Sequence, residues 1–335
     1  MSIFLSRYRG ILIALTATTA WATTAIFISH LLDNYNLRPL SLAFWRDLFV
    51  GVILFILVAL GQPSALRLTR RDVPFFVVYG FFGLAVFNSL WTYSVKFNGA
   101  AVATVLAYSS PAFTVLLARP VLKEPLTSRK LIAVALSLAG CVLVAEAYSV
   151  EQWQLNPIGI LVGLGTGLAF AFFNLAGRWS AGRFKSSWTV TTYGFLFAAL
   201  GLSLTQRIDL PANPAQSTGI FFANPAFSMG SAWNGWVVLG LLTIPTVLGY
   251  GLYTLSLRYL QASVAGLIAT LEPALTAIMA IFILDEWLIE MQWLGAGLIV
   301  VAVLLVQGES VQSQTSTDPR EVSVVDDSSL QRRER

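Results

Sequence analysis

Charged residues are scarce in this chain, and so are cysteine and histidine. Of its 335 residues 11% are charged, whereas soluble domains carry about 25%, so the composition argues against a soluble fold. The single cysteine, Cys141, excludes an intrachain disulfide and a cysteine metal cluster. The single histidine, His30, excludes a metal site made of several histidines. No basic run is interleaved with aromatic residues, so we expect no nucleic acid partner.

Long apolar stretches are abundant instead. Hydrophobic residues make up 56% of the chain, and apolar stretches of about 17 to 25 residues recur with short polar breaks. Each can cross a bilayer as a helix, whereas the strands of a membrane barrel are about ten residues long and alternate apolar with polar residues. We therefore predict an all-α integral membrane protein of ten transmembrane helices. The expected spans are 10–32, 39–61, 73–95, 99–119, 130–148, 157–178, 187–205, 233–257, 263–284 and 291–307.

The polar segments between the spans predict how the chain lies in the membrane. Lys and Arg collect in alternate segments, and such positive residues are held on the cytoplasmic side. Only Arg38, Lys96 and Arg207 fall on the opposite side. We therefore expect a multi-pass plasma-membrane protein with both termini in the cytoplasm. These termini are a short segment, 1–9, and a polar tail, 308–335, whose composition is typical of disorder.

An internal repeat is the strongest pattern in the sequence. Residues 88–143 align without a gap to the stretch that lies 162 positions later. The coincident pairs include Pro111 with Pro273 and Glu124 with Glu286. Proline and glutamate are uncommon in apolar helices, so their coincidence indicates a duplicated unit.

The repeat predicts two related halves, 10–148 and 157–307. The first and sixth spans align at an offset of 149, which places Trp21 opposite Phe170. Since each half has five spans, an odd number, the second half enters the bilayer from the opposite side. Inverted repeats of this kind are typical of transporters, which bind a solute near the midplane between the halves.

The two repeat signatures resemble a known family. They are PAFTVLLARPVLKEPLT and LEPALTAIMAIFILDEWL, followed in the second half by the small-residue helix LGAGLIVVAVLLV. With the arrangement of two times five spans, they resemble the EamA family of the drug/metabolite transporter superfamily. The resemblance implies a secondary transporter or exporter of amino acids, metabolites or drugs. The first signature departs from the usual Gly-Glu ending, because Lys123 precedes Glu124.

Glu272 is the sharpest candidate for a functional side chain. It lies well inside the ninth span, directly before Pro273, and its repeat partner is the neutral Ser110. An ionisable residue within the membrane is costly and is a functional candidate by default. Proline removes a backbone donor and can open a helix where a ligand or ion binds. Glu272 could therefore bind a substrate amine or a coupling proton; the alternative is a residue that only packs helices together.

Further polar and aromatic residues at helical spacing are expected to line a solute cavity. Asn88 and Thr92 are four positions apart, as are their repeat partners Tyr250 and Thr254, so each pair shares one helix face. Aromatic walls with few hydrogen-bonding groups suit a small, partly apolar solute. The alternative is that these groups hydrogen-bond one helix to the next. The expected substrate-binding residues are Trp21, Asn88, Trp91, Thr92, Ser109, Ser110, Asn174, Tyr250, Thr254 and Glu272.

Four other charged residues have weaker claims to function. For Arg46 and Asp47 in the second span, a structural role is favoured over substrate recognition. Glu124 and Glu286 fall at the ends of the fourth and ninth spans, on opposite membrane faces. We expect them to be helix-end anchors or gate residues and not a catalytic dyad.

These patterns favour a transporter that works by alternating access, with export as the expected direction. Its partners would be a small-molecule solute and the lipid bilayer, with no cofactor; proton coupling and a homodimer stay open. An intramembrane enzyme would need paired carboxylates, a Ser/His pair or a metal cluster within the spans, and none is visible. A scaffold or signalling protein acting through its tail is the other alternative. Neither alternative needs two opposed halves.

Overall fold

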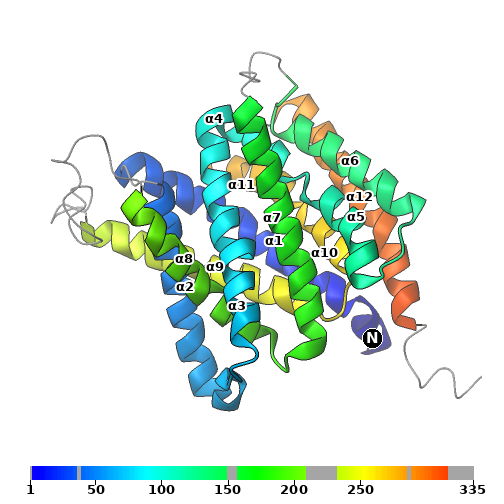
Figure 1. Ribbon diagram of the computed structural model, residues 1–335. Coiled ribbons are helices and arrows are strands. Elements are labelled where there is room, and N and C mark those ends of the chain that lie inside the picture. The colour runs from blue at the N-terminus through cyan, green and yellow to red at the C-terminus, as the bar shows by residue number, and fades with distance from the viewer. Residues whose placement is uncertain (1, 36–38, 149–156, 209–231, 285–287, 316–335) are drawn as a thin grey trace, which may run out of the picture.

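The computed structural model describes residues 2–315 apart from 36–38, 149–156, 209–231 and 285–287 (Figure 1). At some helical positions, Thr92 among them, the backbone alone is described. All regular structure within these residues is helical. The first half contains α1 (Ser2–Tyr35), α2 (Pro39–Gly61), η1 (Pro63–Leu66), α3 (Val73–Gly80), the π-helix η2 (Phe81–Val86), α4 (Phe87–Ala107), α5 (Ser110–Leu122) and α6 (Ser128–Val144). The second half contains α7 (Pro157–Arg183), α8 (Ser187–Ile208), α9 (Ala232–Ser256), α10 (Ala262–Ala269), α11 (Glu272–Leu284) and α12 (Glu290–Thr315).

The described helices have the character of membrane spans, and all ten predicted spans correspond to them. Seven segments are long and apolar enough to cross a bilayer, and α12 adds a shorter apolar stretch. Large apolar side chains face outward, with Leu60 80% and Leu161 72% exposed, whereas the polar Asp47 and Asn174 are fully buried. An apolar exterior around polar groups is what a lipid solvent favours. The prediction of an all-α membrane protein is therefore confirmed.

The packing of the helices pairs the two halves with each other. Helix α1 packs against α9, and its counterpart α7 packs against α4 (Figure 1). Helix α2 packs against α8 and α6 against α12, so equivalent helices of the two halves meet. This is the arrangement expected of two copies related by an approximate twofold axis.

Two glycines in equivalent positions confirm the alignment of the repeats at atomic detail. A Cβ on Gly10 would lie 2.9 Å from Leu260 Cγ, and a Cβ on Gly159 would lie 2.9 Å from Asn98 Cγ. Gly10 and Gly159 are repeat partners, and so are Asn98 and Leu260. The close approach of α1 to the end of α9 is therefore repeated where α7 meets α4.

Each half contains one helix that is interrupted just before a proline. Helix α4 ends at Ala107 and α5 begins at Ser110, one residue before Pro111. In the second half α10 ends at Ala269 and α11 begins at Glu272, directly before Pro273. The opening of the helix that Pro273 permits is therefore present. The single helices predicted over 99–119 and 263–284 are wrong in detail, because each is broken at the same repeat position.

The turn predicted at 96–98 corresponds to a reversal of the chain within the segment assigned to α4. A Cβ on Gly163 of α7 would meet both Ser94 and Leu106, which a straight helix would place too far apart to reach one glycine. The chain therefore runs along α7 as far as Asn98, whose side chain lies against Gly159, and returns past Leu106, so the reversal falls at or just after the predicted turn. The chain ends differ from the prediction. Helix α1 starts at Ser2 and α12 extends to Thr315, so residues 308–315 of the tail predicted as disordered are helical, and the residues after 315 lie outside the described part. Glutamate and glutamine, which are good helix formers, continue the apolar span there.

Candidate functional site

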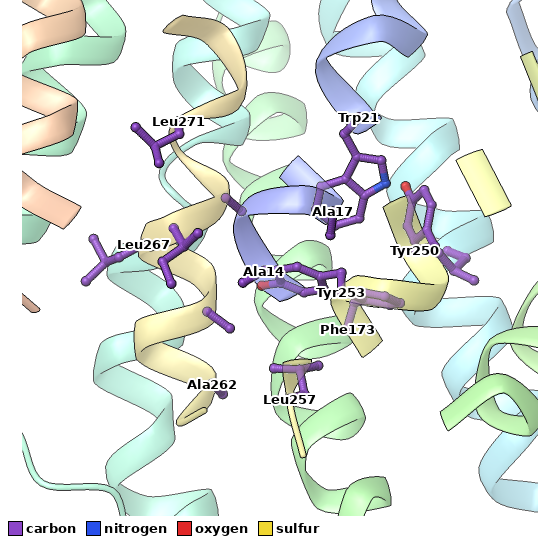
Figure 2. Close-up of a cluster of buried hydrophobic side chains, with 14 of the residues drawn as sticks. Ala14, Ala17, Trp21, Phe173, Tyr250, Tyr253, Leu257, Ala262, Leu267 and Leu271 are labelled. Atoms are coloured by element: carbon purple, nitrogen blue, oxygen red, sulfur yellow. The ribbon is translucent and has the colours of Figure 1, made fainter. Parts of the chain in front are cut away.

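An aromatic cluster lies where the two halves meet. Trp21 of α1 contacts Tyr250 and Tyr253 of α9, with ring centroids 4.8 and 4.7 Å apart. Trp21 also meets its own repeat partner, Phe170 of α7, at 6.1 Å. Figure 2 shows Trp21, Tyr250, Tyr253 and Phe173 converging from α1, α7 and α9. Since repeat partners can touch only near the axis that relates them, this cluster marks the centre of the molecule.

Trp21 brings an unsatisfied donor into that centre. Its side chain is 4% exposed, and its indole Nε1 has no hydrogen-bond partner among the described residues. Figure 2 shows this nitrogen turned toward the hydroxyl of Tyr250. An unpaired buried donor costs about 1–3 kcal/mol, a cost that an acceptor on a bound solute would remove. A Cβ at Gly249 would collide with the indole ring, so this glycine lets Trp21 approach α9 closely.

A charged network from α2 and α4 lies beside the aromatic cluster. Arg46 donates to Asp47 Oδ1 at 3.2 Å and to Asn88 Oδ1 at 2.8 Å. Asn88 in turn donates from its amide nitrogen to Asp47 Oδ2 at 2.9 Å. Asp47 is fully buried and Asn88 is 4% exposed, whereas the Arg46 side chain keeps 13% exposure. The charges of Arg46 and Asp47 thus neutralise each other, and part of the Arg46 side chain stays accessible to solvent.

Glu272 is the first residue of α11, directly after the interruption that separates α11 from α10, and is half-buried. Its carboxyl lies near the hydroxyl of Tyr108, which occupies the interruption between α4 and α5. Cys141 of α6 lies within electrostatic range of the same carboxyl. The two helix breaks, one from each half, therefore meet through a carboxyl and a phenol.

Tyr250 connects these groups into one polar zone. It lies within electrostatic range of Arg46 and Asp47 and also of Glu272. The zone thus contains two carboxylates and one guanidinium, bordered by aromatic rings. Such a set of groups can hold a small solute that carries a hydrogen-bonding or cationic group. Together, the groups Trp21, Arg46, Asp47, Asn88, Tyr108, Tyr250 and Glu272 are called the central cluster below.

The other predicted site residues have different surroundings. Asn174 donates to Thr114 Oγ1 at 3.2 Å and accepts from the Tyr253 hydroxyl at 2.8 Å, so it joins α7 to α5 and α9. Ser109 donates its hydroxyl to the Leu106 carbonyl at 2.6 Å, across the helix break. Ser110 and Thr254 are 1% and 2% exposed, and Trp91 is half-buried. The backbone of Thr92 lies on α4, and its side chain is outside the described residues.

Tyr108 and the Arg46–Asp47 pair were not among the expected solute ligands. A signal for the pair was present, because charges inside a span are functional candidates, yet its bond to Asn88 depends on how α2 and α4 pack. For Tyr108 the signal was its position at the repeat-matched helix break. Within the described residues no group of histidine, cysteine, aspartate and glutamate side chains could hold a metal ion.

Glu124 joins the halves at one end of the molecule. Its Oε1 accepts a hydrogen bond from the Ala262 backbone N–H at 2.7 Å, and its Oε2 accepts from the Ser263 hydroxyl at 2.6 Å. Lys130 lies 3.9 Å from the same carboxylate and donates to Gln261 Oε1 at 2.6 Å. Glu124 of the first half therefore caps α10 of the second half, since a carboxylate is favourable at a helix N-terminus. Glu286, its repeat partner, lies outside the described residues.

The surroundings of this contact are rich in arginine and lysine. Arg9, Lys123, Arg178 and Arg258 lie here, and this end is called the basic end below.

A neighbouring loop also contains a carboxylate that accepts hydrogen bonds, Asp72. The Thr69 hydroxyl, at 2.6 Å, and then the Arg183 guanidinium, at 3.2 Å, donate to Asp72, and these hydrogen bonds hold the pKa of Asp72 below its ordinary value. The exposed ion pair of Arg183 with Asp72 ties the end of α7 to the start of α3.

Known proteins resemble this chain along most of its length. A family model described as the EamA-like transporter family matches residues 8–145 and, a second time, residues 157–307. The uncharacterized transporter YyaM of Bacillus subtilis is 23% identical over 276 residues, which cover 81% of this chain and 85% of that protein. The uncharacterized inner membrane transporter YicL of Salmonella typhimurium is 23% identical over 313 residues, covering 91% and 97%.

Further matches come from an archaeon and from a solved structure. An uncharacterized transporter of Archaeoglobus fulgidus is 25% identical over 306 residues, covering 89% of this chain and 96% of that protein. One crystal structure of a protein matches with a TM-score of 0.73 at 18% identity, covering 91% of this chain and 98% of the other. At that identity the structural likeness concerns the fold alone.

Proposed function

Because the chain belongs to the EamA-like transporter family, we propose that it is a secondary transporter which binds a small metabolite or amino acid at the central cluster. The solute would contact Trp21, Tyr250 and Glu272, with Trp91, Thr92, Ser109, Ser110 and Thr254 around it. Asn174 would hold the surrounding helices in place. Family membership makes the protein a membrane transporter and not an enzyme, and it leaves the substrate to be identified.

The observation that carries the proposal is the meeting of the two interrupted helices. Interrupted helices near the midplane of inverted-repeat transporters leave polar groups free to bind the solute and its coupling ion. Here Glu272, directly after one interruption, lies near Tyr108 of the other. A carboxyl at the junction of two halves can bind either a substrate amine or a proton, and it feels any movement of one half against the other.

The contact across the basic end supports alternating access. Glu124 and Lys130 of the first half bind the start of α10 in the second half, so the two halves are held together at this point. The abundance of Lys and Arg at this end favours a cytoplasmic location for it, and a plasma-membrane protein with both termini inside. Closure toward the cytoplasm is the state in which an exporter releases its solute.

The proposal is tested by flux measurements in proteoliposomes. Wild type and Glu272→Gln are compared in a pH-jump assay against a pooled library of amino acids and small metabolites. We expect solute flux driven by the proton gradient in the wild type, and flux at the level of empty liposomes in the variant, because the amide cannot exchange a proton. Glu290→Gln, which changes an exposed carboxylate at the start of α12, serves as the control and should transport normally.

Two results would count against parts of the proposal. Proton-driven flux that persists in Glu272→Gln would remove Glu272 from coupling and leave it a packing residue. Absence of flux for every compound, in wild type reconstituted with native helicity and melting behaviour, would argue against a transported metabolite or amino acid.

A further inference from the structure

A cavity of about 430 Å³ opens at the basic end, between the two halves and away from the central cluster. Lys123 and Glu124 line it from the α5–α6 connection of the first half. Arg178 and Trp179 line it from α7, and Arg258 from the α9–α10 connection, both in the second half. We call it the basic-end pocket. Transport through the central cluster does not by itself explain the basic-end pocket.

The charges around the basic-end pocket do not balance. Three cations face one carboxylate, Glu124, and both oxygens of that carboxylate already accept hydrogen bonds from the start of α10. Lys130 lies next to it as a further cation. Arg178 donates one N–H to the backbone carbonyl of Leu257, and Arg258 donates one to that of Lys185. A guanidinium has five N–H donors, so each arginine keeps donors for an anion.

The backbone conformation of Lys123 is a second, independent indication that a cation is favoured at this position. Lys123 follows α5 in the left-handed conformation, with φ 58° and ψ 28°, a position that glycine adopts freely and that strains other residues. This conformation turns the chain back over the helix end, where the Glu124 backbone N–H donates to the Ala118 carbonyl at 3.2 Å. The Lys123 side chain is exposed at the mouth of the pocket. A lysine at a position suited to glycine accepts strain and contributes a cation.

From this geometry we infer that the basic-end pocket binds a phosphate-bearing anion, which bridges Lys123 of the first half to Arg178 and Arg258 of the second. Arginine and lysine together are the usual partners of phosphate. Basic pockets between membrane helices bind anionic lipid headgroups, and the exposed Trp179 beside the pocket suits the interface between lipid and water. A bound anion would hold the two halves together at the basic end.

The test measures how anions shift the melting temperature of the full-length protein in nanodiscs. One arm compares phosphatidylglycerol with phosphatidylcholine nanodiscs. The other adds potassium phosphate, or potassium chloride of equal ionic strength, to phosphatidylcholine nanodiscs. We expect wild type to melt higher with phosphatidylglycerol if the anion is a lipid headgroup, or with soluble phosphate if it is a free ion.

Variants of Lys123 distinguish an anion bound in the pocket from a general effect of positive surface charge. Lys123→Gln keeps the strained backbone and should weaken the apparent affinity for the effective anion about fivefold. Lys123→Gly should melt higher than wild type without the anion, because strain is relieved, and yet gain less from the anion. Arg70→Gln removes an exposed arginine of the neighbouring loop that does not line the pocket, and it should respond as wild type does.

Lys123→Gly is expected to melt higher than wild type without the anion and to gain less from the anion. A variant that merely failed to fold would not show the first of these effects. Equal anion responses in wild type and Lys123→Gln would overturn the inference. So would an equal loss of response in Arg70→Gln and Lys123→Gln, since the effect would then be general surface charge. An absence of any shift in both arms would also overturn it.

Discussion

Asp47 is buried between two polar partners, Arg46 and Asn88. Its two oxygens accept from Arg46 and Asn88, and its side chain is fully buried. Replacing Asp47 by Asn would leave the Arg46 guanidinium facing an amide in a site of low dielectric. Breaking a buried ion pair in this way costs about 3–5 kcal/mol. We expect Asp47→Asn to lower the melting temperature of the protein in detergent strongly, as measured by intrinsic fluorescence.

A double substitution distinguishes a lost ion pair from lost packing. In Arg46→Gln/Asp47→Asn both charges are removed together, so no uncompensated charge remains and the double variant should be more stable than Asp47→Asn alone. Additive losses in the two single variants and the double variant would show that the pair contributes nothing specific.

The sequence identified Glu272 as a candidate because a carboxylate inside an apolar span stands out without any structural knowledge. It could not identify the partners of that carboxylate. Tyr108 lies far from Glu272 along the chain, and only the packing of the two halves brings them together. The same holds for Glu124, whose partner Ala262 is 138 positions away. Pairing across such distances follows from tertiary structure and not from local pattern.

Helices α6 and α12 pack so closely that their backbones touch at two glycines. A Cβ on Gly140 would lie 2.7 Å from the Gly295 carbonyl oxygen and 2.6 Å from Ile299 Cγ1. A backbone oxygen cannot move aside as a flexible side chain can. We therefore expect Gly140→Ala to destabilise the protein by about 1–3 kcal/mol, measured as a lower melting temperature in detergent.

Gly297, also on α12, provides the matched control. A Cβ at this position meets nothing within 4 Å, so Gly297→Ala should be neutral or stabilising by up to about 1 kcal/mol through helix propensity. Equal effects of the two substitutions would mean that α6 and α12 can separate at little cost.

Helix boundaries show which physical signals a sequence carries. Apolar stretches of bilayer length predicted α2, α7, α8 and α9 to within a few residues, because the membrane itself sets their length. Pro273 predicted the interruption before α11, since proline cannot donate within a helix. The reversal of the chain near the turn expected at 96–98 follows from the same signal, because two spans of bilayer length joined by a short polar break run in opposite directions. The sequence could not show that the backbone stays helical across this reversal.

The molecule as a whole is two inverted copies joined by contacts at both ends. At the basic end Glu124 caps α10; at the other end of the α6–α12 pair, Gln292 donates to Glu146 Oε1 at 2.7 Å. Glu146, like Lys123, closes its helix in the left-handed conformation. The proposed rocking of one half against the other would break one of these contacts and keep the other, so each contact should bias a different state.

Breaking the Glu124 contact should therefore open the basic end. In Glu124→Gln the charge that faces the α10 N-terminus and Lys130 is lost, and a charged cap at a helix N-terminus is worth about 0.3–2 kcal/mol. Spin labels on Arg129 and Gly182, which are exposed positions in opposite halves, would report the separation in a Cys141→Ala background. We expect the distance distribution between them to shift to longer values in Glu124→Gln.

Glu146→Gln is the control for this measurement, because it weakens the contact at the opposite end by an equivalent change. It should leave the Arg129–Gly182 distances unchanged or narrow them, since the basic end then becomes the favoured contact. If both substitutions lengthened the distances equally, the label positions would be reporting general loosening and not a rocking motion. If neither did, the two halves would be held at the basic end by the packing of α1 and α9 and not by the Glu124 carboxylate.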